Sequence, residues 1–89
     1  MPKFFYVYVL RSLRDQGFYI GSTHDLKARF HLHNSGAVRS TSPRRPFDLI
    51  FYEAYRNEYD ATRREVYLKS TKGRTTLKTM LQKFFDKID

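Results

Sequence analysis

Cysteine is absent from this sequence of 89 residues, so neither disulfides nor thiolate metal sites can stabilise the fold. Long apolar runs are absent as well, and none approaches the roughly 18 residues that a membrane-spanning helix needs. The aromatic segment 4–10 is too short for the hydrophobic region of a signal peptide. We therefore expect a soluble, cytoplasmic protein without a membrane partner.

Acidic residues are scarce. Seventeen lysines and arginines stand against nine aspartates and glutamates, which gives a net charge of +8. This excess favours a polyanionic partner, and nucleic acid is the commonest polyanion in the cytosol. A basic surface that serves only solubility is the alternative. Residues 27–45 hold five basic residues and no acidic one, whereas residues 61–83 hold seven and a single acid, Glu65, which therefore either pairs locally or has a function.

The apolar content is sufficient for a packed core. Hydrophobic residues make up 40% of the chain and aromatic residues 17%, which excludes a fully disordered protein. The length fits one domain. We expect a single domain over residues 1–89, with its core within about residues 3–84.

Three segments rich in aromatic and β-branched residues predict strands over residues 4–10, 17–21 and 47–55, and the last of these is expected to be central or well covered. The polar turn of six residues between the first two suits a hairpin. A register set by that loop places Tyr8 directly opposite Tyr19, on the same face of the sheet.

A first helix is predicted between the second and third strands. Ser22 or Thr23 can cap its amino end, and residues 34–36 end it with side chains that tolerate positive φ. One face of this helix carries Leu26, Phe30 and His33.

The second half of the chain is predicted to be mainly helical. A basic loop over residues 36–46 precedes the third strand, and Asp60 then caps a helix over residues 61–70. After a break at residues 71–73, a further helix runs over residues 74–85 with an apolar stripe. The element order predicts an α+β domain, in which helices flank a three-stranded, mainly antiparallel sheet.

Polar side chains from two of these helices are expected to point toward the sheet. Arg29 and His33 lie one turn apart on the first helix and project together at the edge of its apolar face. Glu65 lies on the core-facing side of the second helix, where a carboxylate is costly unless it is paired or binds a cation. Both helices therefore direct polar groups toward the strands that carry Tyr8 and Tyr19.

Each of these residues also has a simpler explanation. Arg29 and Glu65 can form a structural ion pair, and His33 can be a core or helix-end histidine. The seven tyrosines can be packing groups with a solvated edge. Arg44 and Arg45 can belong to an ordinary solvated loop. The residues alone thus indicate a basic binding protein with a polar cluster.

Several short motifs nevertheless occur in a distinctive order. Tyr6-Val7-Tyr8 is followed by Tyr19-Ile20-Gly21, by Arg29 and His33 in one predicted helix, and by Glu65 in the next. Together with the helix end at residues 33–36 and the segment 61–69, these motifs and their spacing resemble the GIY-YIG nuclease superfamily. The resemblance covers nearly the whole chain and is strongest to the small stand-alone bacterial members.

The resemblance implies hydrolysis of DNA phosphodiester bonds with one divalent metal ion, Mg²⁺ or Mn²⁺. Glu65 would hold the metal, and Arg29 would bind the scissile phosphate. Tyr8 or Tyr19 would position or deprotonate the attacking water. Because free tyrosine has a pKa of about 10, a base role requires a nearby cation. His33 would transfer a proton or contact the phosphate.

Two positions depart from the family pattern. Tyr6 stands where the first motif of the family has glycine, and Ser22 stands where some relatives have lysine. We expect no separate DNA-targeting domain and therefore weak, sequence-independent binding through phosphate contacts. The candidate contact residues are Arg39, Arg44, Arg45, Lys69, Lys72 and Arg74.

DNA, including branched or damaged DNA, is the expected substrate, cut with low sequence specificity or with selectivity for structure. A module that binds nucleic acid but no longer cuts it, or that cuts only with an unidentified protein partner, is the alternative. RNA binding rests on charge and aromatic content alone and requires exposed aromatic side chains for stacking. A purely structural role also stays open.

Overall fold

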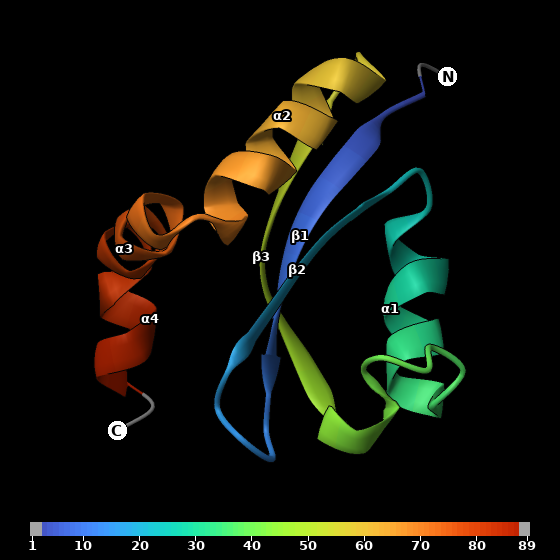
Figure 1. Ribbon diagram of the computed structural model, residues 1–89, viewed down its shortest axis with the longest axis vertical. Helices are drawn as coiled ribbons and strands as arrows, with labels where there is room; N and C mark the ends of the chain where they lie inside the picture. Colours follow the sequence, from blue (N-terminus) through green and yellow to red (C-terminus); the bar gives the residue numbers. More distant parts are fainter. Residues whose placement is uncertain (1–2, 88–89) are drawn as a thin grey trace.

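Strand β1 (Phe5–Ser12) has a run of four buried residues, from Val7 to Leu10, because it lies in the middle of the sheet. Strands β2 (Phe18–Thr23) and β3 (Phe47–Tyr55) flank it, and both are antiparallel to it. The computed structural model describes residues 3–87 and confirms the predicted three-stranded antiparallel sheet (Figure 1). The third strand lies at an edge of the sheet rather than in its middle, because the strand order is β2-β1-β3.

The predicted hairpin register was wrong by two residues. Tyr8 pairs with Gly21, and Tyr19 pairs with Leu10. Strand β1 continues through Ser12, whose backbone N–H donates to the Gly17 carbonyl at 2.9 Å, so the turn is shorter than the six residues assumed. A shift of two preserves the face of each side chain, and Tyr8 and Tyr19 still lie on the same side of the sheet.

Helix α1 (Leu26–Ser35) follows β2 and is capped by Asp25 instead of the predicted Ser22 or Thr23. The Asp25 carboxylate accepts a hydrogen bond from the Ala28 N–H at 3.1 Å. The helix ends as predicted, because Gly36 adopts a φ of 86° that favours glycine. A short 3-10 helix, η1 (Ser42–Arg44), interrupts the basic loop before β3.

Helix α2 (Glu58–Lys69) starts earlier than predicted. Its cap is Asn57, whose side chain accepts from the Tyr59 N–H at 2.8 Å, and Asp60 lies within the first turn. The predicted final helix is two shorter ones, α3 (Thr71–Met80) and α4 (Gln82–Lys87). The expected break at residues 71–73 is a sharp junction at Ser70, because the Ser70 hydroxyl caps α3 by accepting from the Gly73 N–H.

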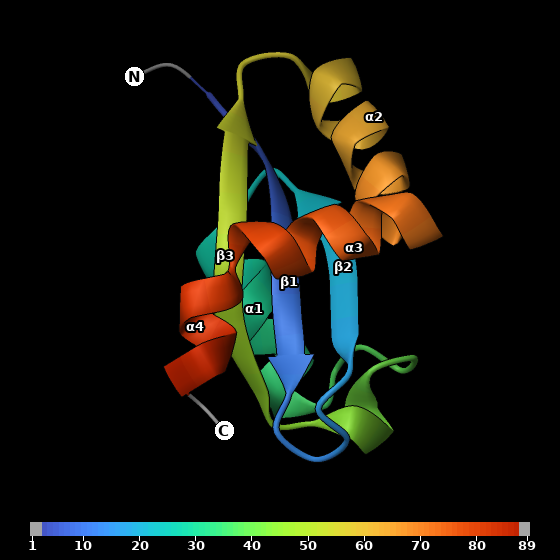
Figure 2. The same ribbon diagram turned by 90° about the vertical axis from the view of Figure 1, so that its left-hand side faces the viewer.

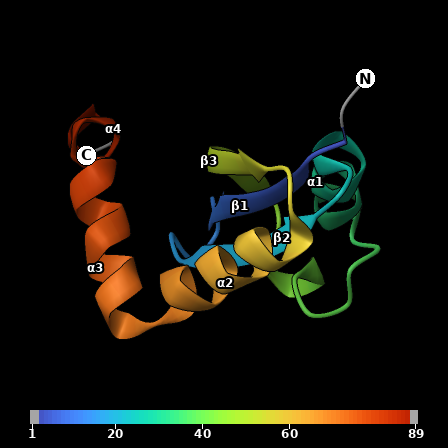
Figure 3. The ribbon, with the colours of Figure 1, turned by 90° about the horizontal axis from the view of Figure 1, so that it is seen from above.

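The alternating side chains of β1 divide the core into two layers. Val7 and Val9 pack with α2 and α3, whereas Tyr8 and Leu10 pack with α1. Figure 2 shows α3 crossing the strands on its side of the sheet, and Figure 3 shows α1 separated from α3 and α4 by the sheet. None of the helices within residues 3–87 is long and apolar enough to cross a membrane.

Candidate active site

A buried chain of hydrogen bonds joins β1, α1 and the loop before η1. The Tyr8 hydroxyl lies 2.9 Å from Nε2 of His33, and Nδ1 of His33 lies 2.8 Å from the Thr41 hydroxyl. The Thr41 hydroxyl donates to the Val38 carbonyl at 3.4 Å, so its oxygen accepts the Nδ1 proton of His33. This arrangement leaves Nε2 as an acceptor, and Tyr8 donates its proton to it.

His33 is neutral in this network. Burial, with a smaller contribution from the Arg29 charge, lowers the pKa of His33 to about 4. A neutral imidazole with a bare Nε2 can accept a proton, whereas an imidazolium could not. His33 is therefore a core residue whose Nε2 accepts a hydrogen bond from the phenol.

The phenol of Tyr8 is held over the backbone of β2. Tyr8 is only 1% exposed, and a Cβ atom at Gly21 would lie 2.6 Å from its hydroxyl oxygen. Only glycine at this position leaves room for the ring. The steric reason for the glycine of the Tyr-Ile-Gly motif is not visible in the sequence, because its position opposite Tyr8 depends on the register.

Three predicted site residues influence the pKa of Tyr8. Burial raises the pKa of Tyr8, hydrogen bonding to Arg29 lowers it, and the nearby Tyr19 and Glu65 raise it. The Tyr19 ring lies 6.4 Å from the Tyr8 ring and 4.8 Å from the His33 ring, measured between centroids. Because the net shift is upward, Tyr8 is a neutral phenol at neutral pH.

Glu65 lies on α2, which packs on the opposite face of the sheet from α1. One carboxylate oxygen accepts from the Ser22 hydroxyl at 2.6 Å, and the other lies 2.7 Å from the Lys69 ammonium. The side chain is 17% exposed. Within residues 3–87, the ion-pair partner of Glu65 is thus Lys69, one turn along the same helix, rather than Arg29.

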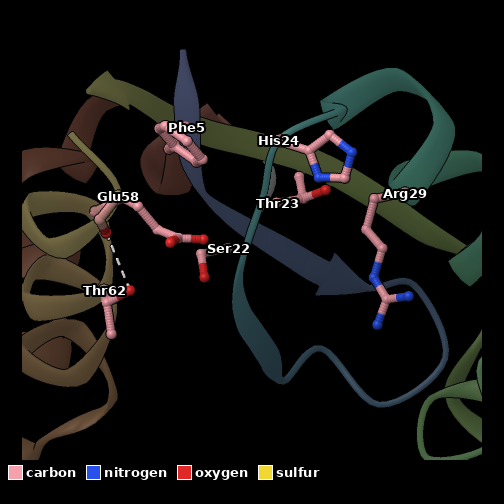
Figure 4. A pocket seen from close by; sticks show the side chains of 8 residues that line it. Phe5, Ser22, Thr23, His24, Arg29, Glu58 and Thr62 are labelled. Carbon is pink, nitrogen blue, oxygen red and sulfur yellow. Dashed lines mark hydrogen bonds between the residues drawn. The ribbon is translucent and has the colours of Figure 1, made fainter. Parts of the chain in front are cut away.

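A cavity of about 300 Å³ opens between α1 and α2 at the end of β2 (Figure 4). Arg29 borders it on the α1 side, and Glu58 and Thr62 border it on the α2 side. Ser22, the partner of Glu65, also lines it. Arg29 and the serine that holds Glu65 therefore line the same cavity. The remaining lining residues are Phe5, Thr23, His24 and Ala61.

Ser22, which lines the cavity, and Glu65, which is hydrogen-bonded to Ser22, offer donor atoms that fit a hard divalent cation. The Glu65 carboxylate and the Ser22 hydroxyl are oxygen donors of the kind that Mg²⁺ and Mn²⁺ accept, with water completing the shell. Within the described part of the chain, no group of three or more histidine, cysteine or acidic side chains is placed to hold a metal. A cation here would compete with the Lys69 ammonium for the Glu65 carboxylate.

The six candidate DNA-contact residues are not equivalent. Arg44 donates to the Asp15 carboxylate at 2.8 Å and lowers the pKa of Asp15 to about 2, so it holds the hairpin turn. Arg45 donates to the Ser42 hydroxyl. Lys69 is engaged by Glu65. The exposed residues among the six that make no ion pair in the described structure are Arg39, Arg45, Lys72 and Arg74.

Residues 4–79 match the GIY-YIG catalytic domain, and the chain belongs to that family. Within the family, the chain is similar to the small bacterial UPF0213 proteins. It is 42% identical over 77 residues to a UPF0213 protein of Pediococcus acidilactici, covering 83% of this chain and 78% of that protein. It is 37% identical over 65 residues to one of Clostridium perfringens, covering 72% and 69%.

A solved structure supports the same relationship. The solution NMR structure of a UPF0213 protein from Bacillus halodurans superimposes with a TM-score of 0.55 at 31% sequence identity. The match covers 86% of this chain and 84% of that one. The resemblance seen in the sequence motifs is thus confirmed, and so is the α+β fold.

Proposed function

We propose that the protein is a metal-dependent endonuclease that hydrolyses DNA phosphodiester bonds with low sequence specificity or with selectivity for DNA structure. One observation carries the proposal: the Tyr8 hydroxyl lies over Gly21, and the next residue, Ser22, donates to Glu65 and lines the same cavity as Arg29. Groups from both faces of the sheet thus converge beside a cavity. The net charge of +8 favours a polyanionic substrate.

Arg29 binds the scissile phosphate in this proposal. Its guanidinium borders the cavity, and its planar fork can donate to two phosphate oxygens at once. Glu65, supported by Ser22, holds the divalent ion. When bound, such an ion stabilises negative charge on the phosphate and lowers the pKa of water.

Tyr8 orients the attacking water. Because its proton is directed to His33, its oxygen presents lone pairs that accept a hydrogen bond from water. As the water attacks phosphorus, its proton moves to the Tyr8 oxygen, and the original Tyr8 proton moves to Nε2 of His33. The bond between phosphorus and the leaving oxygen breaks, and that oxygen takes a proton from solvent. Tyr19 packs over the imidazole and keeps it in place.

The test is cleavage of linear, flapped and branched DNA with Mg²⁺ or Mn²⁺. We expect Glu65→Gln and Arg29→Ala each to lower the cleavage rate by about 100-fold or more, as loss of a charge-stabilising group does in other enzymes. Arg63→Ala is the matched control, because Arg63 is an exposed arginine of α2 paired only with Asp60. Cleavage that is indifferent to both site substitutions would remove the proposal.

A non-cleaving nucleic-acid-binding module is the second candidate. It is favoured by the contacts of Glu65, since both carboxylate oxygens already have protein partners. In that case binding weakens steeply with salt, and Glu65→Gln leaves it intact or tightens it by removing a negative charge. Metal-dependent nicking by the wild type would exclude this candidate.

A further inference from the structure

A second hollow, of about 530 Å³, lies between α1 and the β1–β3 side of the sheet. Its volume falls within the range of about 300–1,000 Å³ that is typical of small-ligand sites. The residues that form its walls are Tyr6, Leu26, Lys27, Phe30, Leu49 and Tyr52, and we call it the Tyr6–Tyr52 groove. The nuclease chemistry proposed above uses none of them.

Two tyrosines dominate the groove. The rings of Tyr6 and Tyr52 meet edge to face, with centroids 6.1 Å apart. Tyr52 is 54% exposed although it sits on a sheet face beside apolar residues. Tyr6 is the residue that replaces the glycine of the first family motif, so the departure from the pattern supplies one wall of the groove.

The charges around the groove suit a nucleic acid strand. Lys27 is exposed at the rim, and the single carboxylate there, Asp25, is engaged in capping α1. His24 lines both the Tyr6–Tyr52 groove and the cavity that Arg29 borders. The two hollows are therefore adjacent, and a strand can pass from one to the other over the start of α1.

We infer that the Tyr6–Tyr52 groove holds an unpaired base of a DNA strand whose neighbouring phosphate lies at Arg29. Aromatic side chains stack on any base, so such a site is tolerant of sequence. A base in duplex DNA is already stacked between its neighbours and cannot enter the groove. The inference rests on the proposed function and deepens it, because it makes single-stranded or flapped DNA the substrate class.

The test is equilibrium binding of a dye-labelled single-stranded oligodeoxynucleotide, measured with EDTA so that nothing is cut. A second oligonucleotide has the same length and the same phosphates, but its central positions are abasic sugars that lack the bases. We expect Tyr52→Ala to weaken binding of the first by about 10-fold and to leave binding of the second within twofold. Tyr59→Ala is the matched control, because Tyr59 is a tyrosine 80% exposed on α2, outside the groove.

Equal effects of Tyr52→Ala on the two oligonucleotides would overturn the inference, as would equal effects of Tyr52→Ala and Tyr59→Ala. A thermal melt of each variant verifies that the fold is retained. The Glu65→Gln variant separates this inference from the proposed function. If Glu65→Gln abolishes cleavage but Tyr52→Ala affects both oligonucleotides equally, the proposed nuclease function stands and the proposed base-binding groove does not. If Tyr52→Ala weakens binding only of the oligonucleotide with bases, and the wild type does not cleave DNA, the base-binding groove stands and the proposed nuclease function does not.

Discussion

The phenol of Tyr8 lies across Gly21, its partner in the neighbouring strand, so closely that any side chain there would collide with it. This relationship connects the two tyrosine motifs of the sequence. The first motif supplies the ring and the second supplies the space that the ring occupies. The position of the proposed water-orienting hydroxyl is thus set by a residue without a side chain.

Gly21→Ala is expected to displace the Tyr8 ring. The new methyl group would meet both the hydroxyl and the ring carbon that bears it, so we expect a loss of about 1–3 kcal/mol in the free energy of unfolding. Cleavage should fall as well, because the Tyr8–His33 bond is disturbed. In a Tyr8→Ala background the same substitution should cost much less, and a double-mutant cycle measures the difference. Additive effects would show that the ring does not depend on the glycine.

The sequence predicted the strands and helices that carry this site more accurately than it predicted the register between the strands. Hydrophobic patterns located the three strands and the helices that carry Arg29 and Glu65. They could not locate Gly21 opposite Tyr8, because hairpin register depends on where the turn closes, and Ser12 prolongs β1 by pairing with β3. The predicted helix caps were also wrong, because several neighbouring polar side chains at the start of each helix can act as its cap.

Charge pairing was the other feature that the sequence left open. The sequence places Lys69 four residues after Glu65, yet the same lysine was a candidate for contacting DNA. Only the arrangement of α2 against β2 shows that Glu65 is held by Ser22 and Lys69 together. The local pair and the distant hydrogen bond use different oxygens of this carboxylate, and the second depends on how α2 packs against β2, which the sequence does not show.

His33 should make the protein sensitive to mild acid. Its pKa of about 4 in the folded state lies below the value of about 6.5 expected for the unfolded chain, so the unfolded state binds more protons between these values. Stability is therefore fully present above about pH 6.5 and falls as the pH drops toward 4, by up to about 3 kcal/mol.

Denaturant unfolding between pH 7 and pH 4 measures this effect. The variant His33→Gln removes the buried imidazole, so it should start less stable and lose less stability on acidification. Asp15 titrates lower, at a pKa of about 2, and does not interfere. Parallel pH profiles of wild type and variant would contradict the assignment of a neutral buried imidazole.

Lys69→Met should improve access of a metal ion to Glu65. The ammonium, 2.7 Å from the carboxylate, competes with any cation there, and methionine keeps most of the side-chain length without the charge. Because a partly exposed ion pair contributes only about 0.2–1 kcal/mol, we expect Mn²⁺ to bind about two- to fivefold more tightly. Calorimetric titration with Mn²⁺ measures this, with Lys72→Met as the control. Unchanged Mn²⁺ affinity combined with weaker DNA binding would make Lys69 a DNA contact instead.

Arg39 and Arg44 should respond differently to removal, although both belong to the same basic loop. Arg39 is exposed, so Arg39→Ala should weaken DNA binding for every sequence and reduce the slope of log affinity against log salt by about 1. Arg44 donates to Asp15 and to the Phe18 carbonyl, and its own carbonyl accepts from the buried Ser12 hydroxyl. Its side chain is thus committed to joining the loop to the hairpin. Arg44→Ala should therefore lower the melting temperature and leave the salt slope nearly unchanged. If Arg44→Ala instead lowers the slope as Arg39→Ala does, the guanidinium leaves Asp15 to bind phosphate, and the hairpin turn is held by its backbone alone.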